Sequence, residues 1–191
     1  WVNIYNEDDK GIADRLFYIN DIIAWNNPNT SKTELFIGVG AQYYTEGAAW
    51  TGTNTTGIYK STNDGVDWTK ITLNTTNGTP YEPNDFEITA DNSIWFGTER
   101  NVWGHGGGTI FKSVDGSTFT VKHTITNGRR TEIAVSKQNP NTIYVLGQVR
   151  TVDGSNNTIA PYLSMLKTTD GFLTAPALNF PSDADTGINA T

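Results

Sequence analysis

The stretch IYKSTNDGVDWTKI, residues 58–71, decides the fold of this chain. An apolar run leads into a polar turn that contains Ser61, Asn63 and Gly65, and the chain leaves the turn through Trp68. Short side-chain oxygens bond backbone N–H groups inside such turns, and glycine accepts the positive φ that they need. A tryptophan directly after the turn is placed to fold back over it and bury its ring. We therefore expect two strands joined by a polar folding clasp.

The pattern recurs along the chain. It returns as IFKSVDGSTF at residues 110–119 and, in a weaker form, as MLKTTDGFLT at residues 165–174. Lys60, Lys112 and Lys167 mark the same position in the three copies. The period is roughly 50 residues, which is in the range for the blades of a β-propeller.

Further strands repeat with the turn. Two precede each copy: NDIIAW (20–25), NDFEIT (84–89) and TEIAVS (131–136), then ELFIGVG (34–40), SIWFGTE (93–99) and TIYVLGQ (142–148). One follows the first two copies: DWTKITL (67–73) and TFTVKHTI (118–125). The sequence thus predicts an all-β chain of about three four-stranded antiparallel blades.

Known propellers have at least about four blades, so we expect a fragment of a larger ring, with the remaining blades of the same polypeptide as partners. The expected divisions of this partial propeller, residues 1–191, are the end of a preceding blade (1–19), three blades (20–79, 80–128 and 129–180) and the start of the next connection (181–191).

The polar turns resemble the Asp-box, or bacterial neuraminidase repeat, with the pattern Ser-x-Asp-x-Gly-x-x-Trp. The matching residues are Ser61, Asn63, Gly65 and Trp68 in the first copy, Ser113, Asp115, Gly116 and Phe119 in a shorter second copy, and Thr168, Asp170 and Gly171 in a third copy without the closing aromatic. The resemblance implies structural turns that lie away from any active site. The alternative, that their carboxylates bind calcium or catalyse, stays open. Sialidases, xyloglucan-degrading hydrolases, sortilin-type receptors and photosystem assembly factors share such boxes, so the resemblance implies a fold rather than a function.

The composition limits the classes of partner. The net charge of −7 leaves no electrostatic footprint for nucleic acid, and no apolar run is long enough for membrane insertion. Without cysteine, disulfides and thiolate metal sites are impossible. We assign no cofactor, metal ligand or catalytic residue. Through its composition, its NPN turns and GIYKS, the chain is also similar to large repeat proteins that Bacteroidota export by type IX secretion, which implies a secreted or cell-surface location.

One edge of the sheets is expected to carry the binding site. In a meander, the loops between the second and third strands share an edge with the connections between blades. Three such loops, residues 41–56, 100–109 and 149–162, are long and rich in glycine or aromatic residues, and long loops on a rigid scaffold commonly carry function. The arginines all fall on this edge: Arg15, Arg100, Arg129, Arg130 and Arg150. They predict an anion-recognising surface, although long loops also collect polar residues by chance.

The ligand-binding candidates are Tyr43, Tyr44, Trp50, Arg100, Trp103, His105 and Arg150. The aromatic rings are suited to stacking on sugars, and the alternative is that they cover their own loops. His105 lacks a second metal ligand at a suitable spacing, so a structural role is the alternative for it. The DADTG stretch, residues 183–187, matches the start of a calcium loop or a polar turn between blades.

Two hypotheses for function follow. The first is a secreted or cell-surface propeller that binds a glycan or a protein partner, or has a structural role, including cargo of a type IX secretion complex. The second, implied by the family resemblance, is a sialidase-like or xyloglucanase-like glycoside hydrolase whose catalytic residues lie mostly elsewhere. A sialidase requires three convergent arginines, and Glu99 and Asp153 are the nearest carboxylates to a catalytic position.

Overall fold

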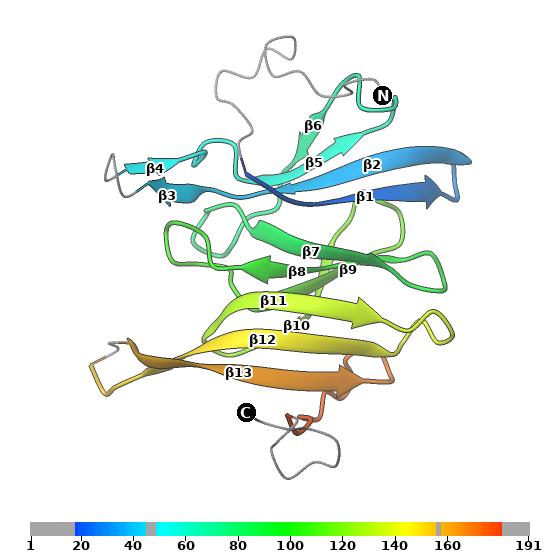
Figure 1. Cartoon of the computed structure of the whole chain (residues 1–191). Coiled ribbons are helices and arrows are strands. Elements are labelled where there is room, and N and C mark those ends of the chain that lie inside the picture. The colour runs from blue at the N-terminus through cyan, green and yellow to red at the C-terminus, as the bar shows by residue number, and fades with distance from the viewer. Residues whose placement is uncertain (1–17, 45–48, 156–157, 181–191) are drawn as a thin grey trace, which may run out of the picture.

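The computed structural model describes residues 18–44, 49–155 and 158–180, and every strand pairing in these ranges is antiparallel. The sheets are stacked one above another, as Figure 1 shows. No helix lies within the described residues. The predicted all-β class is therefore confirmed. Arg15 and residues 183–187, for which the sequence suggested roles, lie outside the described residues, as do residues 1–17 and 181–191.

Two sheets are four-stranded meanders with their strands in chain order. The first consists of β1 (Ile19–Asn27), β2 (Lys32–Val39), β5 (Gly57–Ser61) and β6 (Thr69–Ile71). The second consists of β7 (Glu82–Ile88), β8 (Ile94–Glu99), β9 (Thr109–Ser113) and β10 (Thr120–Thr124). A small hairpin of β3 (Gln42–Tyr44) and β4 (Ala49–Thr51) extends from the first sheet.

The third sheet has three strands in the described part of the chain: β11 (Gly128–Val135), β12 (Ile143–Val152) and β13 (Thr158–Thr168). An isolated bridge between Leu166 and Ala177 stands in the place of a fourth strand. The backbone N–H of Leu178 donates to the carbonyl of Met165 at 2.8 Å, which holds this short segment beside β13.

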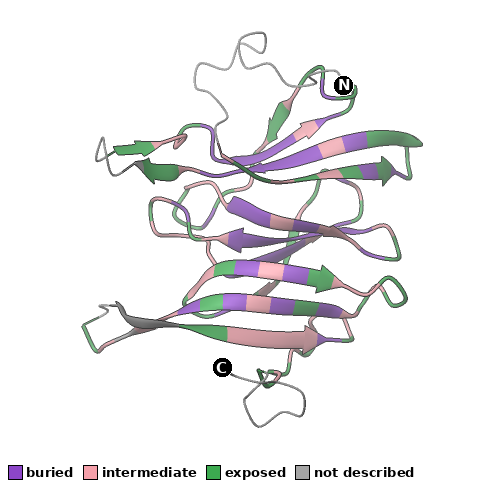
Figure 2. Ribbon diagram, in the orientation of Figure 1, coloured by how far each residue is buried: buried purple, intermediate pink, exposed green. Residues whose placement is uncertain are grey.

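The apolar core lies between neighbouring sheets (Figure 2). Large buried side chains between the first and second sheets are Trp25, Phe36, Ile58, Phe86, Phe96 and Phe111, and those between the second and third include Trp95, Ile110, Ile133, Ile143 and Val145. A glycine in β8 allows the third sheet to approach: a Cβ added at Gly97 would lie 2.2 Å from Oγ1 of Thr131. Burial of these rings supplies most of the attraction between sheets.

A repeated side-chain contact joins the first strands of successive sheets. Oδ2 of Asp21 accepts a hydrogen bond from the backbone N–H of Phe86 at 2.7 Å, and Oδ2 of Asp85 accepts one from the N–H of Ile133 at 2.5 Å. The asparagine before each aspartate donates to a backbone carbonyl of the next sheet. The repeated Asn-Asp pair in the sequence is therefore a link between sheets.

Each polar turn is closed by hydrogen bonds between its own side chains and its backbone. Oγ of Ser61 accepts the N–H of Gly65 at 2.9 Å, and Oγ of Ser113 accepts the N–H of Gly116 at 3.0 Å. Trp68, which the sequence placed over its turn, packs against Ile37, Val39 and Tyr59 of its own sheet. The ring of Phe119 lies 5.4 Å from that of Phe96, in the core between the first two sheets.

The third turn uses a different residue from the one matched by sequence. Oγ1 of Thr168 accepts the N–H of Phe172 at 2.9 Å, so Phe172 occupies the place that Gly65 has in the first turn. Gly171 precedes it, and both residues have positive φ, 67° and 71°. The ring of Phe172 packs 5.8 Å from that of Trp95 and so supplies an aromatic contact for this turn.

Candidate functional site

The loop between β8 and β9 is organised by a buried asparagine. The backbone N–H of Asn101 donates to the carbonyl of His105, and its side-chain Oδ1 accepts the N–H of His105, both at 2.9 Å. Its amide also donates to the carbonyl of Pro80 at 2.8 Å. Positive φ values at Gly104 and Gly106, 86° and 77°, let the loop turn sharply between these bonds. The loop is thus fixed by contacts that hold Arg100 at its start.

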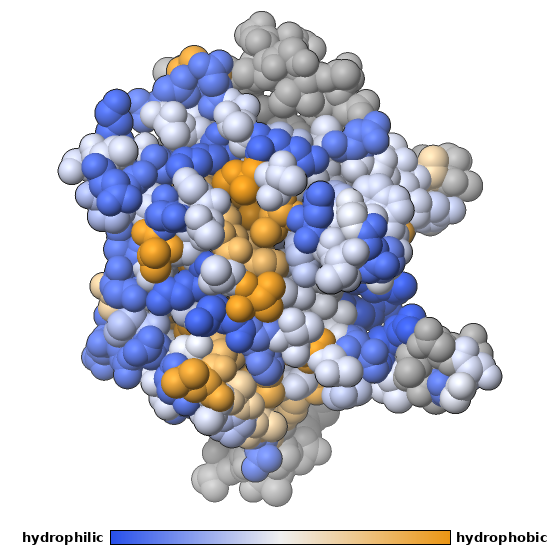
Figure 3. All heavy atoms as spheres, turned by 180° about the vertical axis from the view of Figure 1, so that it is seen from behind, coloured by the Kyte–Doolittle hydropathy of each residue, from blue (hydrophilic) through white to orange (hydrophobic). Residues whose placement is uncertain are grey.

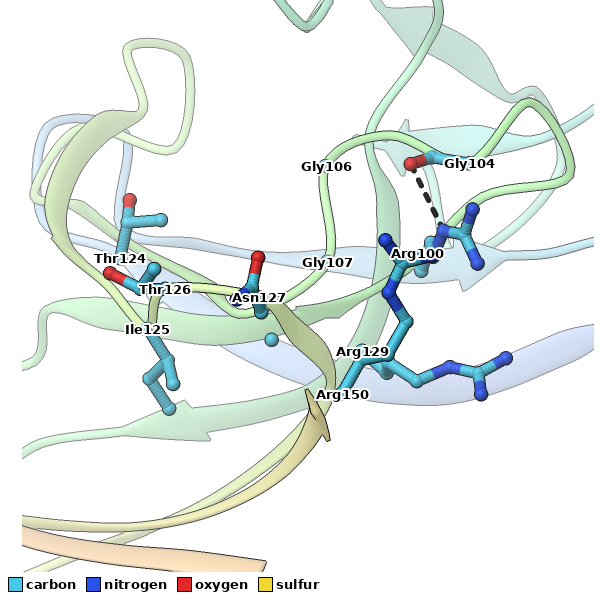
Figure 4. A pocket seen from close by; sticks show the side chains of 11 residues that line it. Arg100, Gly104, Gly106, Gly107, Thr124, Ile125, Thr126, Asn127, Arg129 and Arg150 are labelled. Atoms are coloured by element: carbon cyan, nitrogen blue, oxygen red, sulfur yellow. Dashed lines mark hydrogen bonds between the residues drawn. The ribbon is translucent and has the colours of Figure 1, made fainter. Parts of the chain in front are cut away.

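Main-chain hydrogen bonds place the arginines. The N–H of Arg100 donates to the carbonyl of Arg129 at 2.5 Å, and the N–H of Arg150 donates to the carbonyl of Asn127 at 2.9 Å. Nε of Arg100 also donates to the carbonyl of Gly104 at 3.0 Å (Figure 4). Arg129 lies inside β11 rather than in the expected connection, because pairing of β11 with β12 begins at Gly128. Three segments distant in sequence therefore meet at one place.

These segments enclose a pocket of about 220 Å³. Its lining consists of Arg100, Gly104, Gly106, Gly107, Thr124, Ile125, Thr126, Asn127, Gly128, Arg129 and Arg150. Figure 4 shows the three arginines on one side and the threonines with Asn127 on the other. We call it the arginine pocket. Arg100 and Arg150, both candidates from the sequence, line this pocket together.

The electrostatics of the arginine pocket favour an anion. Burial lowers the pKa of Arg100, and the positive charges of Arg150 and Arg129 lower it further. Like charges so close together raise the free energy of the empty pocket. A bound carboxylate, sulfate or phosphate group would relieve that repulsion and accept charge-assisted hydrogen bonds from the guanidinium groups.

Arg130 differs from its neighbour Arg129. Its Nε donates to Oε1 of Glu132 at 2.8 Å, and its Nη1 lies 3.3 Å from Oε2 of Glu99. A smaller hollow of about 120 Å³ lies beside these groups and shares Arg100 and Arg129 with the arginine pocket. Arg130 therefore has two carboxylate partners, and it does not line the arginine pocket.

The candidate aromatic residues separate into two places. Tyr43 and Trp50 face each other across β3 and β4 with ring centroids 5.5 Å apart, and their side chains are 44% and 49% exposed. Tyr44 lies in β3, and its side chain is not among those described. Trp103 lies in the loop that begins at Arg100, is 44% exposed, and precedes Gly104 of the pocket lining. Of the described candidate aromatic residues, Trp103 is the one next in sequence to a residue that lines the arginine pocket.

His105 has a structural place. It is half-buried, and its Nδ1 lies 3.2 Å from Oγ1 of Thr79, in addition to its two backbone bonds with Asn101. These contacts tie the loop to the segment before β7. His105 therefore supports the loop, and its neighbours Gly104 and Gly106 line the pocket while it does not.

The expected loop at residues 149–162 is largely strand, and this expectation was wrong. β12 and β13 continue pairing to Val152 and Thr158, so Arg150 lies opposite Pro161 within a long hairpin. This hairpin and the β3–β4 hairpin both extend from the edge that carries the arginine pocket (Figure 1). Figure 3, seen from behind, shows that the edge is hollowed between them.

The carboxylates near this edge are engaged in other contacts. Glu82 lies directly opposite Glu99 in the β7–β8 pair, and only 2% of it is exposed. Burial, followed by the charge of Glu99, raises the pKa of Glu82 to about 8, although the backbone N–H of Ala41 donates to its Oε1 at 3.2 Å. Asp153 accepts the N–H of Ser155 at 2.9 Å in a turn. Thus Glu82 is closed to a substrate, and Glu99 is paired with Arg130.

The described residues contain no group of three or more His, Asp or Glu side chains arranged to hold a metal ion. Within the same ranges there is also no helix of the length and apolar character needed to cross a membrane.

Several pocket residues were not predicted as such from the sequence. Asn127, Thr124 and Thr126 of the pocket, and Asn101 of the loop beside it, were not predicted because asparagine and threonine are common throughout this chain. The Asn-Gly pair at residues 127 and 128 was the available signal, since Asn127 adopts a positive φ of 57° where the chain turns into β11.

Comparison with known proteins gives a likeness to solved structures. No protein-family model matches the chain, and no curated protein matches it. Among solved structures it is similar to the GH74 xyloglucanase from Xanthomonas campestris, with a TM-score of 0.52 and 15% sequence identity. The match covers 85% of this chain but 21% of the xyloglucanase, so the chain spans about a fifth of that protein's length. At this identity the likeness shows the fold alone, which is that of a β-propeller.

Proposed function

We propose that this chain is a binding module of an extracellular β-propeller and that its arginine pocket binds an anionic group of the ligand. The observation that carries the proposal is that Arg100, Arg129 and Arg150 all line one pocket. Guanidinium groups bind carboxylates and phosphates through pairs of directed N–H bonds, which gives both affinity and orientation. The chain as a whole has a net charge of −7, so this site is a local reversal of charge.

The size of the arginine pocket limits the size of the ligand group that can enter it. Its volume of about 220 Å³ is below the range of roughly 300–1,000 Å³ that is usual for drug-sized ligands. It therefore takes one group, such as a single sugar ring or the side chain of a protein partner. The remainder of a larger ligand would lie along the hollowed edge outside it.

The biological setting is part of the same proposal. We place the chain in the Asp-box group of propellers, on a secreted or cell-surface protein, with export through the type IX route of Bacteroidota and a partner in a surface complex or a glycan. The support is the self-bonded geometry of the turns at Ser61, Ser113 and Thr168, together with the absence of cysteine. Secretion of the full polypeptide from a strain with and without that export route tests this part.

An NMR titration tests binding. The Nε–H signals of the arginines would be followed while acetate, sulfate or phosphate replaces chloride at constant ionic strength. We expect saturable shifts at Arg100, Arg129 and Arg150, and their loss in Arg129→Gln. Arg130→Gln is the matched control, because Arg130 is already paired with Glu99 and Glu132. Equal shifts at every arginine, or shifts that persist in Arg129→Gln, would contradict the proposal.

A second candidate function is glycoside hydrolysis, favoured by the likeness to a GH74 xyloglucanase. Glu99 is the carboxylate at the edge that such an activity would use, and Glu82 opposite it is too buried to contact a substrate. Incubation with xyloglucan and with sialosides tests this candidate. Hydrolysis that disappears in Glu99→Gln would establish it in place of a binding role, and we expect no hydrolysis.

A further inference from the structure

The arginine pocket has two chemically different sides. Arg100, Arg129 and Arg150 form the charged side, and Thr124, Thr126 and Asn127 form a neutral side of hydroxyl and amide groups (Figure 4). All three neutral residues are exposed, so their polar groups are open to a ligand. A simple inorganic anion would use only the charged side. The neutral side is suited to a ligand that also carries hydroxyl groups.

Between the two sides the pocket has a floor without side chains. A Cβ added at Gly107 would lie 2.6 Å from the carbonyl oxygens of Arg129 and Gly128, so the loop packs directly on β11 there. Gly106 continues this floor, with a positive φ of 77°. Because the Cβ positions that these glycines lack face β11 and Tyr81, the loop packs against the protein and presents backbone to a ligand ring. The ring would then place one substituent toward the arginines and others toward Thr126 and Asn127.

An aromatic surface adjoins the charged side. Trp103 stands in a turn closed by the hydrogen bond from the N–H of Gly104 to the carbonyl of Asn101 at 2.8 Å. Its neighbour Gly104 lines the pocket and accepts the Nε–H of Arg100. Trp103 is therefore the sequence neighbour of a pocket residue, and 44% of it is exposed. An exposed indole offers a broad apolar face to the next ring of an extended ligand.

From these three features we propose that the ligand is an acidic glycan containing a uronic acid. This inference rests on the proposed function. The carboxylate of one uronic acid is bound by Arg100, Arg129 and Arg150, its ring hydroxyls bond the Thr126 and Asn127 side, and the neighbouring sugar stacks on Trp103. A carboxylate on a pyranose ring matches both sides of the pocket, and one ring suits a volume of about 220 Å³.

Calorimetry with matched saccharides tests the inference. The probes are tetragalacturonate, its fully methyl-esterified form, a hyaluronan tetrasaccharide and a sulfated neutral tetrasaccharide, with acetate as the anion without a ring. We expect at least one of the two uronates to bind ten-fold or more tightly than acetate, the ester and the sulfated probe. Arg129→Gln is expected to abolish binding of the uronate, as it does for acetate.

Variants on the neutral side separate this inference from the proposed function. Thr126→Val keeps the shape of the side chain and removes the hydroxyl, and Trp103→Ala removes the exposed ring. Each is expected to weaken uronate binding about ten-fold and to leave the acetate shifts unchanged, with thermal unfolding as the check on folding. Trp50→Ala, on the neighbouring hairpin, is the aromatic control and should leave affinity unchanged.

The possible outcomes distinguish failure of this inference from failure of the proposed function. If acetate and sulfate bind through Arg129 but the uronates bind no more tightly, the inference is overturned and the anion site stands. Tighter binding of the sulfated probe, or no effect of both Thr126→Val and Trp103→Ala, also overturns it. If no anion binds at all, the proposed function and the inference fail together.

Discussion

The backbone N–H of Arg100 donates a hydrogen bond to the backbone carbonyl of Arg129 across 2.5 Å. Arg100 directly follows β8 of the second sheet and Arg129 lies in β11 of the third, so this bond joins two sheets at the arginine pocket. Main-chain groups make the contact. Substitution of either side chain therefore removes charge from the pocket and keeps the bond that shapes it.

The pocket floor at Gly106 and Gly107 leaves no room for a side chain at Gly107. In Gly107→Ala the new Cβ would lie 2.6 Å from the carbonyl oxygens of Arg129 and Gly128, so the loop must move away from β11. We expect a loss of about 1–3 kcal/mol in the free energy of unfolding, as for other overpacked sites, together with loss of anion binding. Urea unfolding and the NMR titration measure the two effects.

The control for this substitution is Gly154→Ala, because a Cβ there would meet no atom within 4 Å. Its stability and its anion binding should equal those of the unsubstituted protein. Unchanged binding in Gly107→Ala would show that the close approach of the loop to β11 does not shape the pocket.

The link between sheets at Asp85 gives a second prediction. Asp85→Ala leaves the N–H of Ile133 without its acceptor in a largely buried place, which costs about 1–3 kcal/mol of unfolding free energy. Asp85→Asn retains an acceptor oxygen and is expected to lose less. Urea unfolding near neutral pH compares the two variants. Equal losses in both would mean that the carboxylate charge, and not the hydrogen bond, stabilises this contact.

The sequence predicted those features of the fold that depend on short local patterns. Strand alternation and the self-bonded turns are encoded within about ten residues, so the sheets and the role of Ser61 followed directly. The pocket depends on contacts between distant segments. Arg129 joins it only because β11 begins pairing at Gly128, and the β-branched residues after Gln148 extend β12 where a loop was expected. Composition alone could not distinguish Asn101 from the other asparagines.

The polar turn that opened the sequence analysis can be tested at Ser61. Its Oγ accepts the N–H of Gly65 at 2.9 Å and donates to Oδ1 of Asn63, and the side chain is buried. Ser61→Ala leaves that N–H unpaired, so we expect a loss of about 1–3 kcal/mol in the free energy of unfolding. Ser117→Ala, at an exposed position of the second turn, should have no measurable effect. If the polar turn contributes nothing to stability, both variants will be as stable as the parent in urea unfolding.

Burial of Glu82 predicts how stability depends on pH. Its pKa is raised from 4.5 to about 8 in the folded chain, mainly by burial and then by the charge of Glu99. Between these two values the unfolded chain releases a proton that the folded chain retains, so the free energy of unfolding decreases as the pH rises through this window. Glu82→Gln cannot ionise, and its stability relative to the parent should therefore increase by up to roughly 1.4 kcal/mol for each pH unit. Urea unfolding at several pH values across the window measures the difference, with the exposed substitution Ser117→Ala, which removes no titratable group, expected to follow the parent. Parallel curves for Glu82→Gln and the parent would show that Glu82 is ionised in the folded chain at neutral pH, in which case this edge of the second sheet carries one more negative charge beside Glu99.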